Sequence, residues 1–118
     1  MKSYRELDVW KEARKLVSLV YLTTRQFPKE EVYGIVNQMR KCAISIPSNI
    51  AEGCGRKTSK ETIHFLYISR GSLYELETQS FLSKDLKFIS EEELDKLLIQ
   101  INACMKLLNG FINYYKKL

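Results

Sequence analysis

The sequence is poor in the residues that most catalytic sites need. It contains one histidine, His64, so every scheme that uses a histidine base, nucleophile partner or metal ligand depends on that residue. None of the five glycines stands in the spacing of a phosphate-binding loop. Glu61 and His64 have the Glu-x-x-His spacing of di-iron bundles, but such a site needs a second pair and two further carboxylates. We therefore predict that the protein is not an enzyme and holds no metal or cofactor.

Cysteines and long apolar runs are also scarce. The three cysteines, Cys42, Cys54 and Cys104, are odd in number and form no Cys-x-x-Cys pair, which is typical of thiols in a reducing compartment. No apolar stretch approaches the roughly 20 residues that a membrane span needs. Residues 1–8 are polar, unlike a secretory signal. We expect a cytoplasmic protein that does not associate with membranes.

Positive charge is concentrated in the first half of the chain. The net charge is +5; residues 1–60 carry twelve Lys or Arg and six Asp or Glu, whereas residues 61–118 carry seven and eight. This asymmetry favours an acidic partner, of which nucleic acid is the usual one. A group of cations near the second predicted helix and its connection could contact phosphates, or could simply keep a loop soluble. These candidates are Arg40, Lys41, Arg56, Lys57 and Lys60.

The sequence is rich in helical periodicity. Apolar residues recur at helical spacing over four segments, about 7–26, 30–53, 58–87 and 90–115. The starts of three helices carry capping-box spacing, a Ser or Thr followed three residues later by Glu. These pairs are Ser3 with Glu6, Thr58 with Glu61, and Ser90 with Glu93. Four helices with short connections predict an all-α fold, an up-down antiparallel four-helix bundle that forms a single domain over 1–118.

Two residues interrupt otherwise regular helices. Pro47 lies inside the second helix, where proline removes a backbone hydrogen bond, but the apolar spacing continues on both sides of it. We therefore predict a kink near Pro47 rather than a break. Gly71 lies inside the third helix, and with Ser69 and Ser72 it predicts a small-residue patch that another backbone could approach closely.

The second helix has two faces outside its core stripe when it is projected at about 100° per residue. One mixes apolar and cationic groups, and an exposed Ile44 there favours a partner surface. The other is small and hydrogen-bonding. It either faces water or forms a subunit interface, and its low content of Lys favours the interface. Glu52 on this face could pair with an arginine. The residues of the hydrogen-bonding face are Gln38, Ser45, Asn49, Glu52 and Arg56.

Several segments together resemble one known family. They are YRELDVWKEA (4–13), FPKEEVYG (27–34), Gln38-Met39-Arg40, SIPSNIAEGCGR (45–56) and RGSLYELE (70–77). These segments resemble the four-helix bundle proteins first noticed as products of intervening sequences within bacterial 23S ribosomal RNA genes. The motif residues are structural or interfacial by this resemblance: Gln38, Arg40, Ser45, Ser48, Asn49, Glu52, Gly53, Arg56, Gly71, Ser72 and Glu75.

The resemblance also implies how the protein works. Members commonly form ring-shaped homopentamers. They include the accessory variability protein of diversity-generating retroelements, a basic pentameric barrel that binds nucleic acid and associates with a reverse transcriptase. We accordingly predict a non-enzymatic homo-oligomer that binds RNA, or less favourably DNA, through a basic surface. The alternative is a protein-interaction scaffold or accessory subunit, with a partner such as a reverse transcriptase and no direct nucleic-acid contact.

Overall fold

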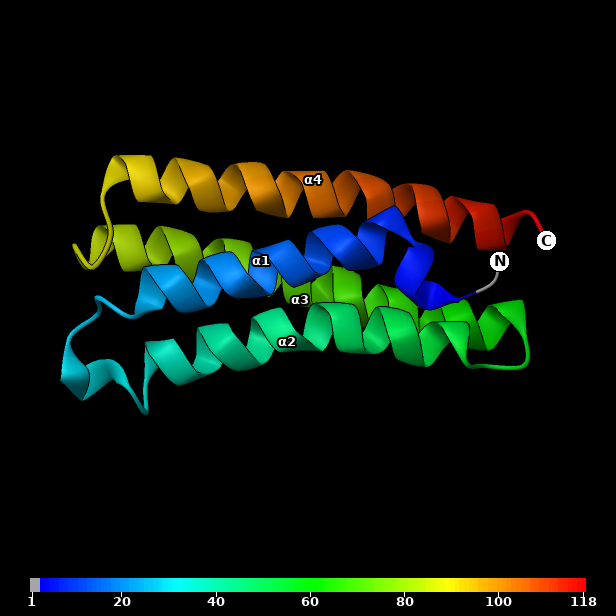
Figure 1. Ribbon diagram of the computed structural model, residues 1–118, viewed down its shortest axis with the longest axis horizontal. Helices are drawn as coiled ribbons and strands as arrows, with labels where there is room; N and C mark the ends of the chain where they lie inside the picture. Colours follow the sequence, from blue (N-terminus) through cyan, green and yellow to red (C-terminus); the bar gives the residue numbers. More distant parts are fainter. Residues whose placement is uncertain (1–2) are drawn as a thin grey trace.

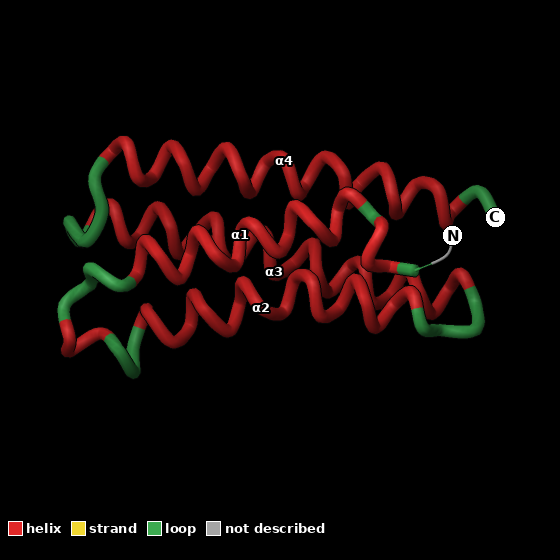
Figure 2. Tube along the Cα trace, in the orientation of Figure 1, coloured by secondary structure: helices red, strands yellow, loops and turns green. Residues whose placement is uncertain are grey.

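Four long α-helices form the bulk of the computed structural model, which describes residues 3–118 (Figure 1). They are α1 (Asp8–Thr24), α2 (Ile35–Cys54), α3 (Ser59–Asp85) and α4 (Glu91–Lys116), with short 3-10 turns η1 (Tyr4–Glu6) and η2 (Lys29–Glu31). Figure 2 shows only helices and loops over the described residues. Successive helices run in opposite directions, and each packs on two others: α1 and α3 both contact α2 and α4. The predicted all-α, up-down four-helix bundle is therefore confirmed.

Capping boxes fix the starts of α3 and α4 as predicted. The backbone amide of Glu61 donates to the Thr58 hydroxyl at 3.2 Å, and the backbone amide of Thr58 donates to the Glu61 carboxylate at 3.3 Å. Ser90 and Glu93 make the same reciprocal pair at 3.1 and 2.9 Å. Each box satisfies two backbone donors that a helix start leaves without a partner.

The predicted start of the second helix is wrong, whereas the first helix starts at Asp8, next to the predicted Leu7, and the Ser3 box does not lengthen it. Ser3 accepts a hydrogen bond from the Arg5 amide at 3.2 Å, which caps only η1, and an extended Leu7 separates that turn from α1. The second helix was expected from Glu30 or Glu31, yet α2 starts at Ile35. A Gly34 with φ of −108° and ψ of −120° breaks the helical path there, so the acidic residues lie in η2 instead.

Helix α2 passes through Pro47 without interruption, so the prediction that Pro47 does not break the helix is confirmed. The bend of its axis stays a prediction. Just before the proline, the Ile46 carbonyl accepts a hydrogen bond from the Ser69 hydroxyl of α3 at 2.9 Å. This contact ties α2 to α3 close to the site where proline removes a backbone donor.

The core lies along the bundle axis and receives one apolar stripe from each helix. Fully buried side chains include Leu16, Val20, Met39, Ile46, Ile50, Leu66, Leu73, Leu76, Leu97, Ile101, Leu108 and Ile112. Burial of such side chains contributes about 1.5–3 kcal/mol each. None of the helices between residues 3 and 118 combines the length and the apolar character that crossing a membrane requires.

Candidate functional site

The middle of the hydrogen-bonding face of α2 contacts α3 of the same chain through Ser45, whereas Gln38, Glu52 and Arg56 of that face are exposed. Ser45 and Ser72 join their hydroxyl oxygens at 2.9 Å across the two helices. The Asn49 amide donates to the Ser45 hydroxyl at 3.0 Å and to its carbonyl at 2.8 Å. The Cys42 thiol donates to the Ser72 carbonyl at 3.0 Å. Small side chains are needed here because they bring two helix backbones close enough for these contacts.

At Gly53, α2 is packed closely against α3. A Cβ atom at this position would lie 3.1 Å from the Phe65 Cβ and 3.1 Å from the Thr62 carbonyl oxygen. The Thr62 hydroxyl donates to the Gly53 carbonyl at 2.8 Å and satisfies a backbone acceptor near the end of α2. Glycine at this position is therefore explained by packing inside one chain.

The predicted small-residue patch on α3 is divided between two sides of that helix. Ser69 is buried and Ser72 half-buried, and both bond to α2. Gly71 points outward, with no described atom within 4 Å of a Cβ built on it. The same outer side of α3 is unusually apolar for a water-facing helix, because Ile68 and Leu82 there are 40% and 46% exposed. Ile44 of α2, 43% exposed, lies on the α1 side of its helix, where it lines a hollow with Tyr21 and Arg40.

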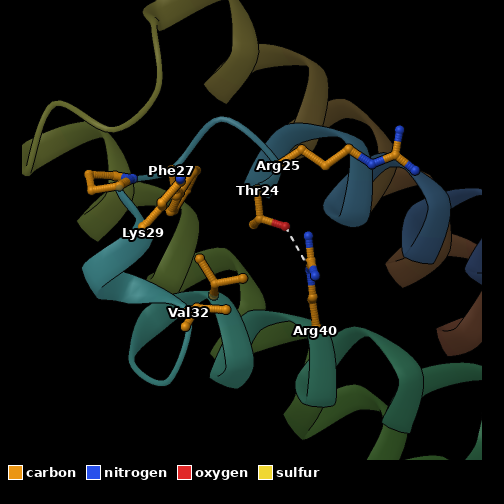
Figure 3. Close-up of a pocket in the computed structure, with 8 residues that line it drawn as sticks. Thr24, Arg25, Phe27, Lys29, Val32 and Arg40 are labelled. Carbon is orange, nitrogen blue, oxygen red and sulfur yellow. Dashed lines mark hydrogen bonds between the residues drawn. The ribbon is translucent and has the colours of Figure 1, made fainter.

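Arg40 joins α2 to α1, as Figure 3 shows. Its Nε donates to the Thr24 hydroxyl at 3.0 Å, and its guanidinium lies 4.4 Å from the centre of the Tyr21 ring. It borders a hollow of about 450 Å³ between the end of α1, η2 and α2, which Phe27 and Val32 also line. In Figure 3 the side chain of Arg25 points away from this hollow. Arg40 is thus used in holding two helices together.

Lys41 is exposed next to Arg40, and it also borders a shallow hollow of about 350 Å³ between α2 and α3. Cys42 lies in this hollow beside Glu75, and burial together with that carboxylate raises the pKa of the Cys42 thiol to about 12. A thiol with so high a pKa stays protonated at neutral pH, which makes it a poor nucleophile. The hollow therefore offers hydrogen bonds rather than nucleophilic chemistry.

The other three predicted cations lie together at the connection between α2 and α3. Arg56 forms an ion pair with Glu52. The arginine predicted to pair with Glu52 therefore belongs to the same chain. The Arg56 guanidinium also lies 4.6 Å from the centre of the Phe65 ring. Lys57 and Lys60 are exposed. Because Arg40 lies roughly 20 Å away along α2, the five candidates form two groups rather than one.

Comparisons with known proteins identify the family and the fold of the chain. The family model described as 23S rRNA-intervening sequence protein matches residues 5–110. The chain belongs to this family. Among solved structures, it is similar to a protein of unknown function from the S23 ribosomal protein family of Bacteroides thetaiotaomicron, with 21% identity and a TM-score of 0.79. The match covers 88% of this chain and 97% of the other, and it shows a shared fold. No curated protein matches the sequence.

In this member of the 23S rRNA-intervening sequence protein family, the motif residues named from the sequence fall into two structural groups. One group makes contacts between helices within the chain, namely Arg40, Ser45, Gly53 and Ser72, and Asn49 supports it by donating to Ser45 of its own helix. The other is exposed at the surface: Gln38, Ser48, Glu52, Arg56, Gly71 and Glu75. The packing of helices within one chain does not explain why the residues of this surface group belong to the motif.

Three further cations belong with the group at the α2–α3 connection. Figure 1 shows that both chain termini lie at the same end of the bundle as this connection. The exposed Arg5, Lys116 and Lys117 are close to those termini. Sequence reasoning missed them, although the predicted up-down topology already places the end of the fourth helix there. We name this group the basic end: Arg5, Arg56, Lys57, Lys60, Lys116 and Lys117.

Metal binding and histidine chemistry receive no support from the described residues. Within residues 3–118, no group of three or more His, Cys, Asp or Glu side chains is arranged to hold a metal ion. His64 is exposed, and its ring meets the edge of Phe65 at 5.4 Å between centres. Burial, with a smaller contribution from Glu12, raises the pKa of Cys104 to about 12. None of these groups is placed as an activated nucleophile or base.

Proposed function

We propose that this chain is a non-enzymatic, self-associating helical-bundle protein that binds nucleic acid, RNA in preference to DNA, through its basic end. The observation that carries the proposal is the charge of that end. Of its six cations, only Arg56 forms an ion pair within residues 3–118. Glu61, the nearest carboxylate in sequence to Lys60, is held in the Thr58 capping box. Five cations therefore present their charge to solvent without an ion-pair partner.

The opposite end of the bundle has the opposite character. The connection between α3 and α4 and the adjoining η2 turn hold seven acidic residues against four lysines. The acids are Glu30, Glu31, Asp85, Glu91, Glu92, Glu93 and Asp95, and the lysines are Lys29, Lys84, Lys87 and Lys96. A polyanion is thus attracted to one end and repelled from the other. Lysines bind phosphates as point charges, so this attraction is indifferent to sequence.

Binding that depends on the basic end should weaken steeply with salt. We expect the affinity for a fluorescently labelled RNA to fall at least about tenfold between roughly 50 and 200 mM salt, because three or more phosphate contacts release counterions. Fluorescence anisotropy at the two salt concentrations measures this. No binding at the lower concentration, or the same affinity at both, would contradict the proposed function.

Self-association would use exposed apolar positions of α2 and α3, which we name the α2/α3 face: Ile44, Ile68, Gly71 and Leu82. Its three large side chains are 40–46% exposed, and no described atom lies within 4 Å of a Cβ built on Gly71. Exposed apolar side chains that gather into a patch typically mark interaction sites. Assembly would also bring several basic ends together and raise the affinity for one RNA through avidity.

The substitution Ile44→Asp should reduce the mass of the assembly, because it places a carboxylate on an apolar contact. Ile99→Asp is the matched control, since Ile99 is 70% exposed on α4, away from the α2/α3 face. Multi-angle light scattering measures the mass of both variants. Equal masses for Ile44→Asp and the unsubstituted protein, or a monomeric unsubstituted protein, would show that this face does not carry self-association.

The same α2/α3 face favours a second candidate function, a protein-interaction scaffold or accessory subunit of a nucleic-acid enzyme such as a reverse transcriptase. In this case the apolar face binds the partner and the basic end makes no direct nucleic-acid contact. Reversing charges at the basic end would then leave function intact, whereas Ile44→Asp would abolish it. The salt titration above separates the two functions.

A further inference from the structure

Two adjoining helix segments at the basic end carry no acidic residue. Residues 62–74 of α3 contain no Asp or Glu, and neither do residues 102–116 of α4 or the two residues after it. All formal charges of these side chains are positive. Cross-contacts hold these segments side by side. Nη1 of Arg70 donates to the Asn109 amide oxygen at 3.2 Å, and the Lys116 ammonium lies 5.6 Å from the centre of the Tyr67 ring.

Each segment contributes one stripe at helical spacing to a surface that we name the α3/α4 face. Residues at i, i+3 and i+7 on α3 supply Tyr67, Arg70 and Tyr74, and residues at i, i+4 and i+7 on α4 supply Asn109, Asn113 and Lys116. The face thus interleaves aromatic rings with cations and amides. It lies on the α4 side of α3, where Arg70 bonds to Asn109 and Tyr67 lies beside Lys116.

The two tyrosines of this face differ in what covers their rings. The Arg70 guanidinium lies 4.6 Å from the centre of the Tyr67 ring, so one partner already stacks there. A hydrogen bond with Lys116 lowers the pKa of the Tyr67 hydroxyl. Tyr74 is 56% exposed, and no aromatic ring or cation within residues 3–118 stacks on it. Tyr74 therefore presents an uncovered ring one helical turn from Arg70 on one side and from Glu77 on the other.

We propose that the α3/α4 face binds unpaired nucleic acid, with a base stacked on Tyr74 and phosphates on Arg70 and Lys116. This inference rests on the proposed function and specifies its substrate class. Aromatic rings stack bases that are not paired, whereas bases inside a duplex are stacked on one another and cannot reach a side chain. Only Nη1 of Arg70 has a protein acceptor within residues 3–118, so other guanidinium donors remain for a phosphate.

The test compares an unstructured RNA of about 12 nucleotides with the same RNA annealed to its complement. Anisotropy titrations use the full chain and its Tyr74→Ser and Tyr74→Trp variants. Tyr33→Ser is the matched control, because Tyr33 is 92% exposed near η2, at the acidic end of the bundle. We expect Tyr74→Ser to lower affinity for the single strand at least about fivefold, the lower limit for one lost stacked base. Affinity for the duplex should stay unchanged, and Tyr74→Trp should keep single-strand binding.

The outcomes separate this inference from the proposed function. If Tyr74→Ser binds the single strand as Tyr33→Ser does, or weakens single strand and duplex equally, the stacking inference is overturned while RNA binding stands. If the unsubstituted protein binds neither RNA at low salt, both proposals are overturned. Arg70→Gln provides a second variant that does not change an aromatic ring. It should reduce the slope of log affinity against log salt by about one phosphate contact, and an unchanged slope contradicts the assignment of Arg70.

Discussion

Replacing Lys57 and Lys60 together by glutamate should lower the affinity for RNA at least about tenfold at physiological salt. The double substitution changes the local charge by four units where the structure places two cations without ion-pair partners. It should not harm the fold, because both residues are exposed and a glutamate near the start of α3 interacts favourably with the helix dipole. Anisotropy titration with one labelled RNA measures the change.

The matched control reverses two lysines at the opposite end of the bundle. Lys87 and Lys96 are exposed and lie near the α3–α4 connection, so Lys87→Glu with Lys96→Glu gives the same net charge at the acidic end. This variant should keep RNA affinity within about twofold, because the altered charges lie beyond a Debye length from the basic end. Equal losses in the two double variants would mean that net charge, rather than the basic end, governs binding.

The substitution Gly53→Val should destabilise the protein by about 1–3 kcal/mol. The added carbons have to enter the gap between α2 and α3, where even a Cβ would stand 3.1 Å from both Phe65 and the Thr62 carbonyl. The separation of the helices would weaken the 2.8 Å hydrogen bond from Thr62 to the Gly53 carbonyl. Chemical denaturation followed by far-ultraviolet circular dichroism gives the free energy of unfolding.

Gly71→Val provides the comparison for this stability prediction. It makes the same chemical change inside a helix, but no described atom lies within 4 Å of the new Cβ. Because glycine is the poorer helix former, we expect Gly71→Val to be neutral or to stabilise by a few tenths of a kcal/mol. If both variants lost equal stability, the close packing at Gly53 would not explain why glycine stands there.

Local signals in the sequence predicted much of this fold. Apolar periodicity and the capping boxes at Thr58 and Ser90 depend on residues within a few positions of one another, and the structure confirms the helices that they start. The box at Ser3 failed for a physical reason. Its spacing is right, but the extended backbone at Leu7 ends the turn before it can continue into α1.

The site was harder to predict because its outcome depends on neighbours distant in sequence. Helical projection predicted on which face of the helix Ser45 lies, but it could not predict what that side chain contacts. The hydroxyl that it bonds belongs to Ser72, 27 positions away in the sequence. Arg40 looked like a phosphate ligand, although Tyr21 and Thr24 of α1 engage its guanidinium. Lys116 was assigned no role because no local motif surrounds it. Only the antiparallel arrangement of α3 and α4 brings it to Tyr67.

The length of the bundle determines whether the charges at its two ends interact with each other. The molecule extends 45 Å along its longest axis, whereas the Debye length is about 8 Å at physiological ionic strength and about 30 Å at 0.01 M. The cations near the chain termini and the acids near the α3–α4 connection are thus screened from each other at either salt concentration. A polyanion near one end therefore interacts with the local charge of that end. The net charge of +5 for the whole chain does not describe this interaction.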